Sequence, residues 1–106
     1  MSADQVLERE AWVVMATMRT TDVVYRHWYA SFCVLLPAAT SVDAGTVAER
    51  IRSNIESTPL FAETDVTVSV GVAVGGDSEP VSETAHRADA ALKSVSSSGG
   101  NIVVYE

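Results

Sequence analysis

The residues best suited to chemistry in this sequence gather in one stretch, RTTDVVYRHWYASFCVLLP, at positions 19–37. It opens with Arg19 and Asp22, an opposite-charge pair three positions apart at the end of a predicted helix. Such a pair often binds to itself and closes the helix end, where an arginine also complements the helix dipole. Two or three well-placed arginines are also enough to bind a compact anion such as a nucleotide. A structural and an anion-binding interpretation of this pair therefore both stay open.

The same stretch contains a hairpin whose turn has an unusual composition. Runs rich in Val, Leu, Tyr and Phe at 22–27 and 32–36 predict two short strands. The segment WYAS, residues 28–31, stands between them, where a tight β-turn favours Gly, Asn or Asp. The geometry of a hairpin alone does not explain these four residues.

Few other residues offer catalytic or metal-binding chemistry. Cys33 lies inside an apolar run and is expected to be a small buried hydrophobe rather than a reactive thiol. His27 and His86 are far apart in sequence and have no carboxylate or cysteine cluster at ligand spacing. The segment GGDS at 75–78 lacks the lysine and helix of a phosphate-binding loop and predicts a turn. We therefore expect no metal and no cofactor.

Length and charge restrict the class of protein. A chain of 106 residues predicts one domain, 1–106. A net charge of -7 with only seven lysines and arginines argues against a nucleic-acid surface. No apolar run approaches the roughly 20 residues that cross a bilayer, and the polar N-terminus is unlike a secretory signal. A single cysteine fits a reducing compartment. We expect a soluble, cytoplasmic protein without a membrane or nucleic-acid partner.

Hydrophobic periodicity predicts the elements that position these residues. Apolar residues recur at helical spacing in three segments and alternate in two segments beyond the hairpin. The order of elements is αββαβαβ, which favours an α+β sandwich with helices covering a mainly antiparallel sheet. The predicted helices span 3–19, 44–55 and 82–95, and the further strands span 66–74 and 101–105.

Several blocks, in order and at the right separation, resemble the GGDEF domain of diguanylate cyclases. They read RTTDVVYRH, WYASF, CVLLP, AERIR, VTVSVGVAV and RADAALKSVSSSGGN. Those enzymes condense two GTP molecules into cyclic di-GMP, a bacterial second messenger. The resemblance extends from residue 4 to residue 105. It implies a ferredoxin-like, nucleotidyl-cyclase-like sandwich that lacks the family's first strand and helix.

The family's signature turn falls on Trp28, Tyr29, Ala30, Ser31 and Phe32, and only Phe32 matches it. In the family, the two glycines let the backbone approach the GTP phosphates, and the acidic residues bind divalent metals and help activate the attacking hydroxyl. Mg²⁺ prefers charged oxygen ligands, which Ala30 and Ser31 do not supply. Trp28 and Tyr29 would also fill the space that glycine leaves open.

Other losses point in the same direction. The family's phosphate-binding lysine and arginine fall on Ser96 and Gly100. Its first strand, which carries another metal-binding aspartate, has no counterpart, and neither does its phenylalanine-lysine-asparagine-aspartate block. The resemblance therefore implies a domain that does not condense GTP.

Arg19-Thr20-Thr21-Asp22 matches the RxxD motif of the family's inhibitory site, where cyclic di-GMP binds away from the active site. Arg50, in the block AERIR, falls on the second arginine of that site. The resemblance implies that Arg19 contacts a phosphate or a guanine edge and that Asp22 accepts from guanine N–H groups. We expect a catalytically inactive domain that acts as a cyclic di-GMP receptor or regulatory module.

Two alternatives accompany this interpretation. Asp4 falls on a position that touches guanine in active enzymes, but either it or Ser2 could instead cap the first helix. The domain as a whole would otherwise be a ligand-free interaction or dimerisation module. In that case the exposed aromatics Trp28 and Tyr29 become an interface anchor, or they pack over the vacated active site.

The strand that the resemblance implies to be missing would lie between the strands at 32–36 and 66–74. Without it, these two strands pair directly as parallel neighbours joined by a right-handed crossover. The alternative leaves apolar strand edges unpaired, which invites association with a second chain. We therefore predict a homodimer or a complex with a partner signalling protein.

Overall fold

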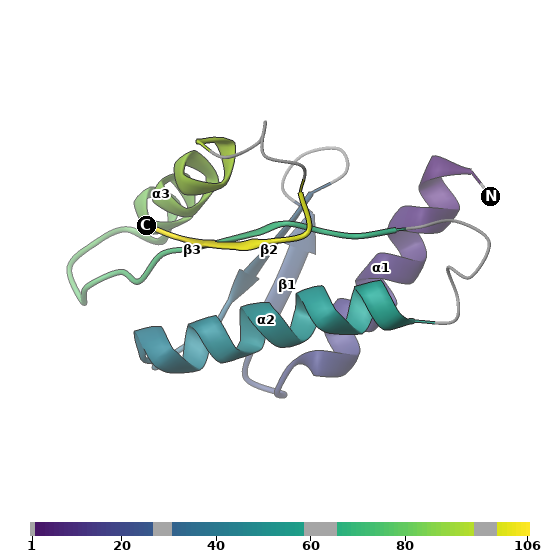
Figure 1. The fold of residues 1–106 in the computed structure, drawn as a ribbon. Helices are drawn as coiled ribbons and strands as arrows, with labels where there is room; N and C mark the ends of the chain where they lie inside the picture. The colour runs from purple at the N-terminus through teal and green to yellow at the C-terminus, as the bar shows by residue number, and fades with distance from the viewer. Residues whose placement is uncertain (1, 27–30, 59–65, 95–99) are drawn as a thin grey trace.

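The computed structural model describes residues 2–26, 31–58, 66–94 and 100–106 (Figure 1). In these ranges the elements follow one another in the predicted order αββαβαβ. They are α1 (Ala3–Thr17), β1 (Val23–Arg26), β2 (Phe32–Leu35), α2 (Ser41–Ser57), β3 (Val70–Val72), α3 (Val81–Lys93) and β4 (Val103–Tyr105). The helices of the described ranges are all too short or too polar to cross a membrane.

Helix α1 begins with a capping box. The Gln5 N–H donates to Ser2 Oγ at 3.2 Å, and the Ser2 N–H donates to Gln5 Oε1 at 2.9 Å. These reciprocal bonds satisfy two of the N–H groups that a helix start leaves unpaired. Asp4 lies inside the first turn and is exposed. Of the two predicted cap candidates, Ser2 is therefore confirmed and Asp4 is wrong.

The packing of α1 against α2 forms the core. Val14 of α1 is buried against Ile51 and Ile55 of α2, and Ile55 is only 1% exposed. The spacing of four between the two isoleucines places both on one face of α2. Partly buried residues from both helices, from the β1–β2 pair and from the segment that leads into β3 surround this cluster: Val6, Val13, Met18, Val24, Val34, Val47, Val66 and Val68.

The strands form two separate pairs. β1 and β2 are antiparallel, with Tyr25 opposite Cys33, and β3 and β4 are parallel, with Gly71 opposite Val104. Within the described ranges no hydrogen-bonded ladder joins the pairs. The prediction of a mainly antiparallel sheet is therefore wrong. Direct pairing of the strand at 32–36 with the strand at 66–74 is also not formed, and the alternative with unpaired strand edges is the one that the described residues show. The β3–β4 pair packs on α2, and the β1–β2 pair packs on the core cluster that α1 and α2 form together.

The strand predicted over 66–74 is confirmed only at Val70–Val72. Val66 and Val68 still pack on the core while Thr67 between them is exposed, so the predicted alternation is present. The ladder stops because β4 begins opposite Val70. Residues 66–69 have no neighbouring strand in the described part of the chain.

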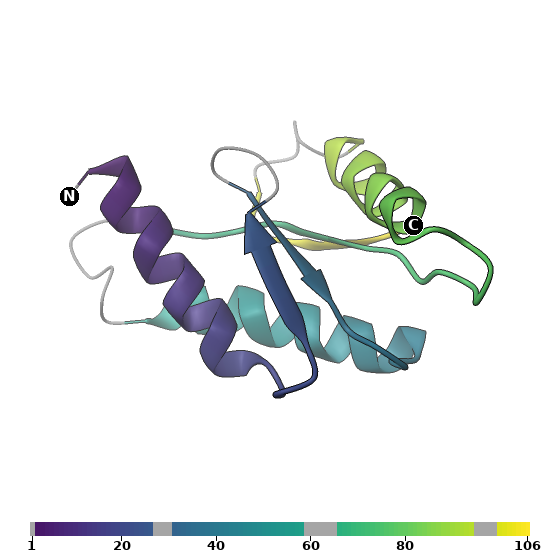
Figure 2. The same cartoon turned by 180° about the vertical axis from the view of Figure 1, so that it is seen from behind.

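Helices α2 and α3 cover opposite faces of the β3–β4 pair (Figure 1). Gly71 lets α3 approach closely, because a Cβ at this position would collide with the Ala88 carbonyl. From the opposite side, α1 and the β1–β2 hairpin lie in front of α2 (Figure 2). The order of elements and the two-sided covering of β3–β4 agree with the predicted α+β sandwich.

One polar residue interrupts the core face of α1. Glu10 lies on the same stripe as Leu7 and Val14 and is only 9% exposed. No hydrogen bond or ion pair to its carboxylate occurs among the described residues. Burial raises the pKa of Glu10 above its ordinary value of 4.5, because a poorly solvated site disfavours the charged form.

We predict that Glu10→Gln increases the free energy of unfolding at pH 7. A carboxyl whose pKa is raised on folding binds its proton more tightly in the folded state. As pH rises through the ordinary pKa of glutamate, the Glu10 carboxyl loses its proton in the unfolded state before it does so in the folded state. The free energy of unfolding therefore falls as pH rises above that pKa. The gain from the substitution should therefore disappear in acid, where both states are protonated.

Urea denaturation at several pH values measures this effect. The matched control is Glu8→Gln, on the same helix but exposed, which should change stability little. A gain for Glu10→Gln that is the same at acidic and neutral pH would contradict the burial of its charge.

Candidate functional site

Arg19 and Asp22 form a closed turn between α1 and β1. The Asp22 carboxylate accepts from the Arg19 backbone N–H at 2.9 Å, from its Nε at 3.3 Å and from its Nη2 at 3.0 Å. The Asp22 N–H in turn donates to the Arg19 carbonyl at 3.1 Å. Arg19 Nη2 also lies 3.5 Å from the carbonyl oxygen of Pro37. Hydrogen bonds to the backbone and to the side chain of Arg19 therefore both hold it in this turn.

The two side chains of this pair differ in their exposure. That of Asp22 is 1% exposed, whereas that of Arg19 is 60% exposed. The hydrogen bonds from Arg19 lower the pKa of Asp22, because they favour the ionised carboxylate. Since Asp22 is enclosed and its oxygens are occupied, the group that faces solvent is the guanidinium.

Arg50 lies on the side of α2 that is next to this turn. Asp43, Val47, Arg50 and Asn54 are spaced by four, three and four, so they form one stripe along the helix. Asn54 Nδ2 donates to Thr17 Oγ1 at 3.2 Å, two residues before Arg19. At the other end of the stripe, the charge of Asp43 adds to the main effect of Asp22 in raising the pKa of Arg19. Both ends of the stripe therefore lie near the end of α1 and the Arg19 turn, and Arg50 lies between them.

Arg50 is exposed, and among the described residues it has no hydrogen-bond or ion-pair partner. This distinguishes it from Arg52, which binds Glu49 and Glu56 and donates to Asn101 Oδ1 at 2.9 Å. Arg52 ties α2 to the start of β4, whereas the guanidinium of Arg50 is available to a ligand.

The signature-turn residues Trp28, Tyr29 and Ala30 lie outside the described residues, as does His27. At the edge of the turn, the Arg26 guanidinium carbon lies 5.5 Å from the centre of the Phe32 ring, a cation–π contact. Arg26 and Phe32 are also opposite each other in the hairpin register. The last pair of the ladder is thus held by side chains as well as by backbone.

The other candidate residues do not assemble into a site. His86 is exposed on α3, Ser96 lies outside the described residues, and Gly100 has a positive φ of 78°. Cys33 is half-buried rather than fully buried, and its partner across the ladder is Tyr25. A hydrogen bond to Cys33 raises the pKa of Tyr25.

A divalent metal, which the resemblance to diguanylate cyclases implies, does not fit the residues present. The sequence WYASF at 28–32 contains no carboxylate, and Mg²⁺ requires hard, charged oxygen ligands. Within the part of the chain that the structure describes, no three His, Cys, Asp or Glu side chains lie close enough to hold a metal ion. No catalytic step is therefore assigned to a metal.

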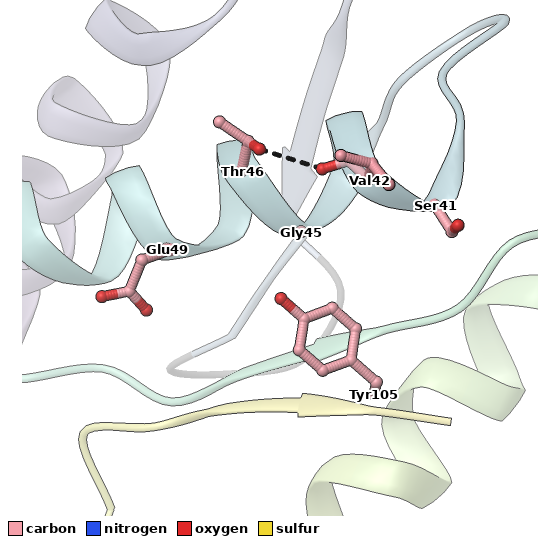
Figure 3. Close-up of a pocket in the computed structure, with 6 residues that line it drawn as sticks. All are labelled: Ser41, Val42, Gly45, Thr46, Glu49 and Tyr105. Atoms are coloured by element: carbon pink, nitrogen blue, oxygen red, sulfur yellow. Dashed lines mark hydrogen bonds between the residues drawn. The ribbon is translucent and has the colours of Figure 1, made fainter.

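A hollow of about 620 Å³ lies elsewhere, between the first turns of α2 and strand β4 (Figure 3). The Tyr105 hydroxyl points at Gly45, where a Cβ would be 2.6 Å from it. Glu49 at the rim is already bound by Arg52. The sequence did not indicate this hollow, because the approach of Tyr105 to Gly45 depends on the tertiary fold. It contains none of the residues predicted to bind a ligand.

Comparison with known proteins identifies the family. A model of the diguanylate cyclase GGDEF domain matches residues 1–102. The chain is 31% identical over 107 residues to the response regulator PleD of Caulobacter vibrioides. This match covers 95% of this chain and 24% of PleD. It is 32% identical over 106 residues to diguanylate cyclase A of Treponema denticola, covering 96% of this chain and 29% of that protein.

A solved structure gives the same result. The crystal structure of the diguanylate cyclase SiaD of Pseudomonas aeruginosa, in complex with its activator SiaC, matches with a TM-score of 0.86 and 35% identity. The match covers 97% of this chain and 41% of that one. The chain therefore belongs to the GGDEF family, and the predicted fold is confirmed. It spans about a quarter of the length of the curated relatives.

We predict that the Asp22 carboxyl titrates below the ordinary range of aspartate and that Arg19→Ala moves its pKa upward. The contribution of Asp22 to stability is present above its unfolded pKa and is lost as pH falls through its lowered folded pKa. Carbon-detected NMR titration of the side-chain carboxyls measures both values. Lys93→Ala, which removes an exposed ion pair on α3, is the control and should leave Asp22 unchanged. An ordinary pKa for Asp22 in the unaltered chain would refute the pairing.

Proposed function

We propose that this GGDEF domain does not condense GTP and instead binds cyclic di-GMP through Arg19 and Arg50, with Asp22 holding Arg19 in position. The observation that carries the proposal is the contrast between the two ends of the Arg19–Asp22 pair. The carboxylate is enclosed and the guanidinium is exposed, so the pair holds an arginine toward solvent as well as closing a turn.

The chemistry of the ligand suits these groups. Cyclic di-GMP presents phosphates and guanine edges, and a planar guanidinium binds either with two parallel hydrogen bonds. Asp22 restricts the Arg19 side chain before the ligand arrives, which reduces the conformational entropy lost on binding. Arg50 on the adjoining stripe supplies a second positive charge without first having to break an ion pair.

Asp22 has a different role in this proposal from the one that the sequence suggested. A direct bond from Asp22 to guanine requires it to exchange its bonds to Arg19. If Asp22 only holds Arg19 in position, it keeps all of these hydrogen bonds when the ligand binds. Asp22 is therefore proposed as a positioning residue, and the two arginines as the ligand contacts.

The loss of catalysis is argued from donor chemistry. Phosphoryl transfer depends on metal ions that neutralise the developing charge, and on carboxylates that hold those ions. Residues 28–32 supply neither the carboxylates nor the glycines of the family's signature turn. The proposed domain is thus a receptor for the product of the reaction that its relatives catalyse.

We predict that the chain binds cyclic di-GMP and that Arg19→Ala and Arg50→Ala each weaken binding by roughly 10- to 100-fold. This range corresponds to about 1.5–3 kcal/mol for a hydrogen bond to a charged group. Titration calorimetry measures the affinity. Lys93→Ala is the matched control for the loss of one positive charge, and it should bind as tightly as the unaltered chain. No heat with the unaltered chain would refute the receptor function, and equal affinity in the Arg19 and Arg50 variants would move the site elsewhere.

We also predict that the chain forms no cyclic di-GMP from GTP and Mg²⁺. Chromatographic analysis of the products over a long incubation is the measurement, and an active diguanylate cyclase under the same conditions is the positive control. Cyclic di-GMP produced by the purified chain would contradict the proposed loss of catalysis.

A further inference from the structure

The turn between β2 and α2 contains a residue in an unusual conformation. The Ala39 N–H donates to the Leu36 carbonyl at 3.2 Å, which closes a β-turn over residues 36–39. Pro37 is its second residue, and Ala38, the third, has a positive φ of 60°. Since the ring of Pro37 fixes a negative φ, the turn is of type II. Glycine or asparagine is the usual third residue of such a turn.

Ala38 is strained in this turn. A residue with a Cβ is disfavoured in the left-handed region, because the Cβ lies too close to the following carbonyl oxygen. In the described part of the chain, Ala38 and Asn101 are the two non-glycine residues with a positive φ, and asparagine tolerates it better than alanine. A type I turn closes with the same hydrogen bond and needs no positive φ. Contacts outside the turn therefore have to favour type II.

Arg19 makes a contact that distinguishes the two turn types. Types I and II differ in the direction of the peptide group between their central residues, which is rotated by roughly half a turn. In the type II turn seen here, the Pro37 carbonyl oxygen lies 3.5 Å from Arg19 Nη2. In a type I turn this carbonyl would point to the opposite side, and the Ala38 N–H would face Arg19 in its place. The contact with Arg19 thus favours the strained turn.

An anion bound to Arg19 conflicts with the present direction of this carbonyl. Arg19 uses Nε and Nη2 to hold Asp22, and among the described residues its Nη1 has no partner. A phosphate that accepts from both Nη atoms therefore lies beside the Pro37 oxygen. Two acceptors then compete for Nη2, and their negative charges repel each other. Pro37 and Ala38 are both exposed, so a ligand at Arg19 can reach them.

We propose that the peptide group between Pro37 and Ala38 rotates when cyclic di-GMP binds, so that the Ala38 N–H donates to a phosphate held by Arg19. The rotation removes the opposing carbonyl, adds a donor to the site and relieves the strain at Ala38. In the free protein the same carbonyl contacts Arg19 and helps to hold its guanidinium. This inference rests on the proposed function, to which it adds a third ligand contact besides Arg19 and Arg50.

The proposal makes ligand affinity depend on residue 38, although its side chain does not touch the ligand. If binding requires the rotated turn, the apparent dissociation constant rises as that turn becomes rarer in the free protein. Glycine carries no strain at a positive φ, so it favours the unrotated turn. A β-branched residue is more strained there than alanine, so it favours the rotated turn.

The first test measures cyclic di-GMP affinity by titration calorimetry in two variants of residue 38. We expect Ala38→Gly to weaken binding roughly 3- to 10-fold and Ala38→Val to strengthen it. The melting temperature of the free chain should change in the opposite sense, rising in Ala38→Gly and falling in Ala38→Val. Gly76→Ala is the control for a glycine–alanine exchange in a turn, because a Cβ at Gly76 has no neighbour within 4 Å. It should leave the affinity unchanged.

The second test observes the turn itself by NMR. A type II turn brings the Pro37 Hα close to the Ala38 amide proton, so the nuclear Overhauser effect between these protons reports the rotation. We expect a strong effect in the free chain and a weak one at saturating cyclic di-GMP. Arg19→Ala should weaken the effect without any ligand, because the contact that favours type II is lost. Lys93→Ala, on α3, should leave it unchanged.

A strong Overhauser effect that persists at saturating ligand would overturn the rotation but not the proposed function. Equal affinities of Ala38→Gly and Ala38→Val, or weaker binding by both, would also overturn it, because general damage to the turn has one direction only. An unchanged effect in Arg19→Ala would refute the role of the Arg19 contact. No binding by the unaltered chain would refute the proposed function and the ligand-driven rotation together, and the Arg19→Ala spectrum would then still decide whether Arg19 holds the turn.

Discussion

The contact between α1 and α2 forms the core on which the hairpin and the segment that leads into β3 pack. Val14, Ile51 and Ile55 bring the two helices together, and residues of the β1–β2 pair and of the segment that leads into β3 pack on this cluster. Deleting a buried isoleucine side chain typically costs about 2–5 kcal/mol, a large part of the stability of a small domain. The same contact decides where the end of α1 meets α2. The position of Arg19 beside the Arg50 stripe is thus a consequence of core packing.

The turn formed by Arg19 and Asp22 makes this region beside α2 a candidate binding site. A buried carboxylate is stable only when its oxygens are hydrogen-bonded, and here the arginine and its backbone supply those bonds. The structural interpretation and the binding interpretation are therefore compatible. The pair closes the helix end, as its spacing suggests, and in doing so it holds a guanidinium toward solvent.

The sequence predicted local features well, because periodicity and turn chemistry are encoded in neighbouring residues. The order of elements and the family follow from such signals. The sequence left open whether the strands at 32–36 and 66–74 pair directly or keep unpaired edges, because the outcome depends on how Val34 and Val66 pack on the helix cluster rather than on their own strand propensity. Ser2 and Asp4 were both candidate caps, because either side chain can accept from a helix N–H, and only the backbone geometry shows that Ser2 forms the capping box with Gln5. The burial of Glu10 and of Asp22 also became visible only in three dimensions, since neither charge has a sequence signal for enclosure.

The central claim is that Arg19 and Arg50 bind cyclic di-GMP while the other arginines do not. NMR of the arginine side-chain Nε–H groups during a cyclic di-GMP titration tests it most directly. We predict that the signals of Arg19 and Arg50 shift together and saturate, whereas those of Arg52 and Arg87, which are held in internal ion pairs, stay in place. Unchanged Arg19 and Arg50 signals at saturating ligand, or shifts confined to other arginines, would contradict the account.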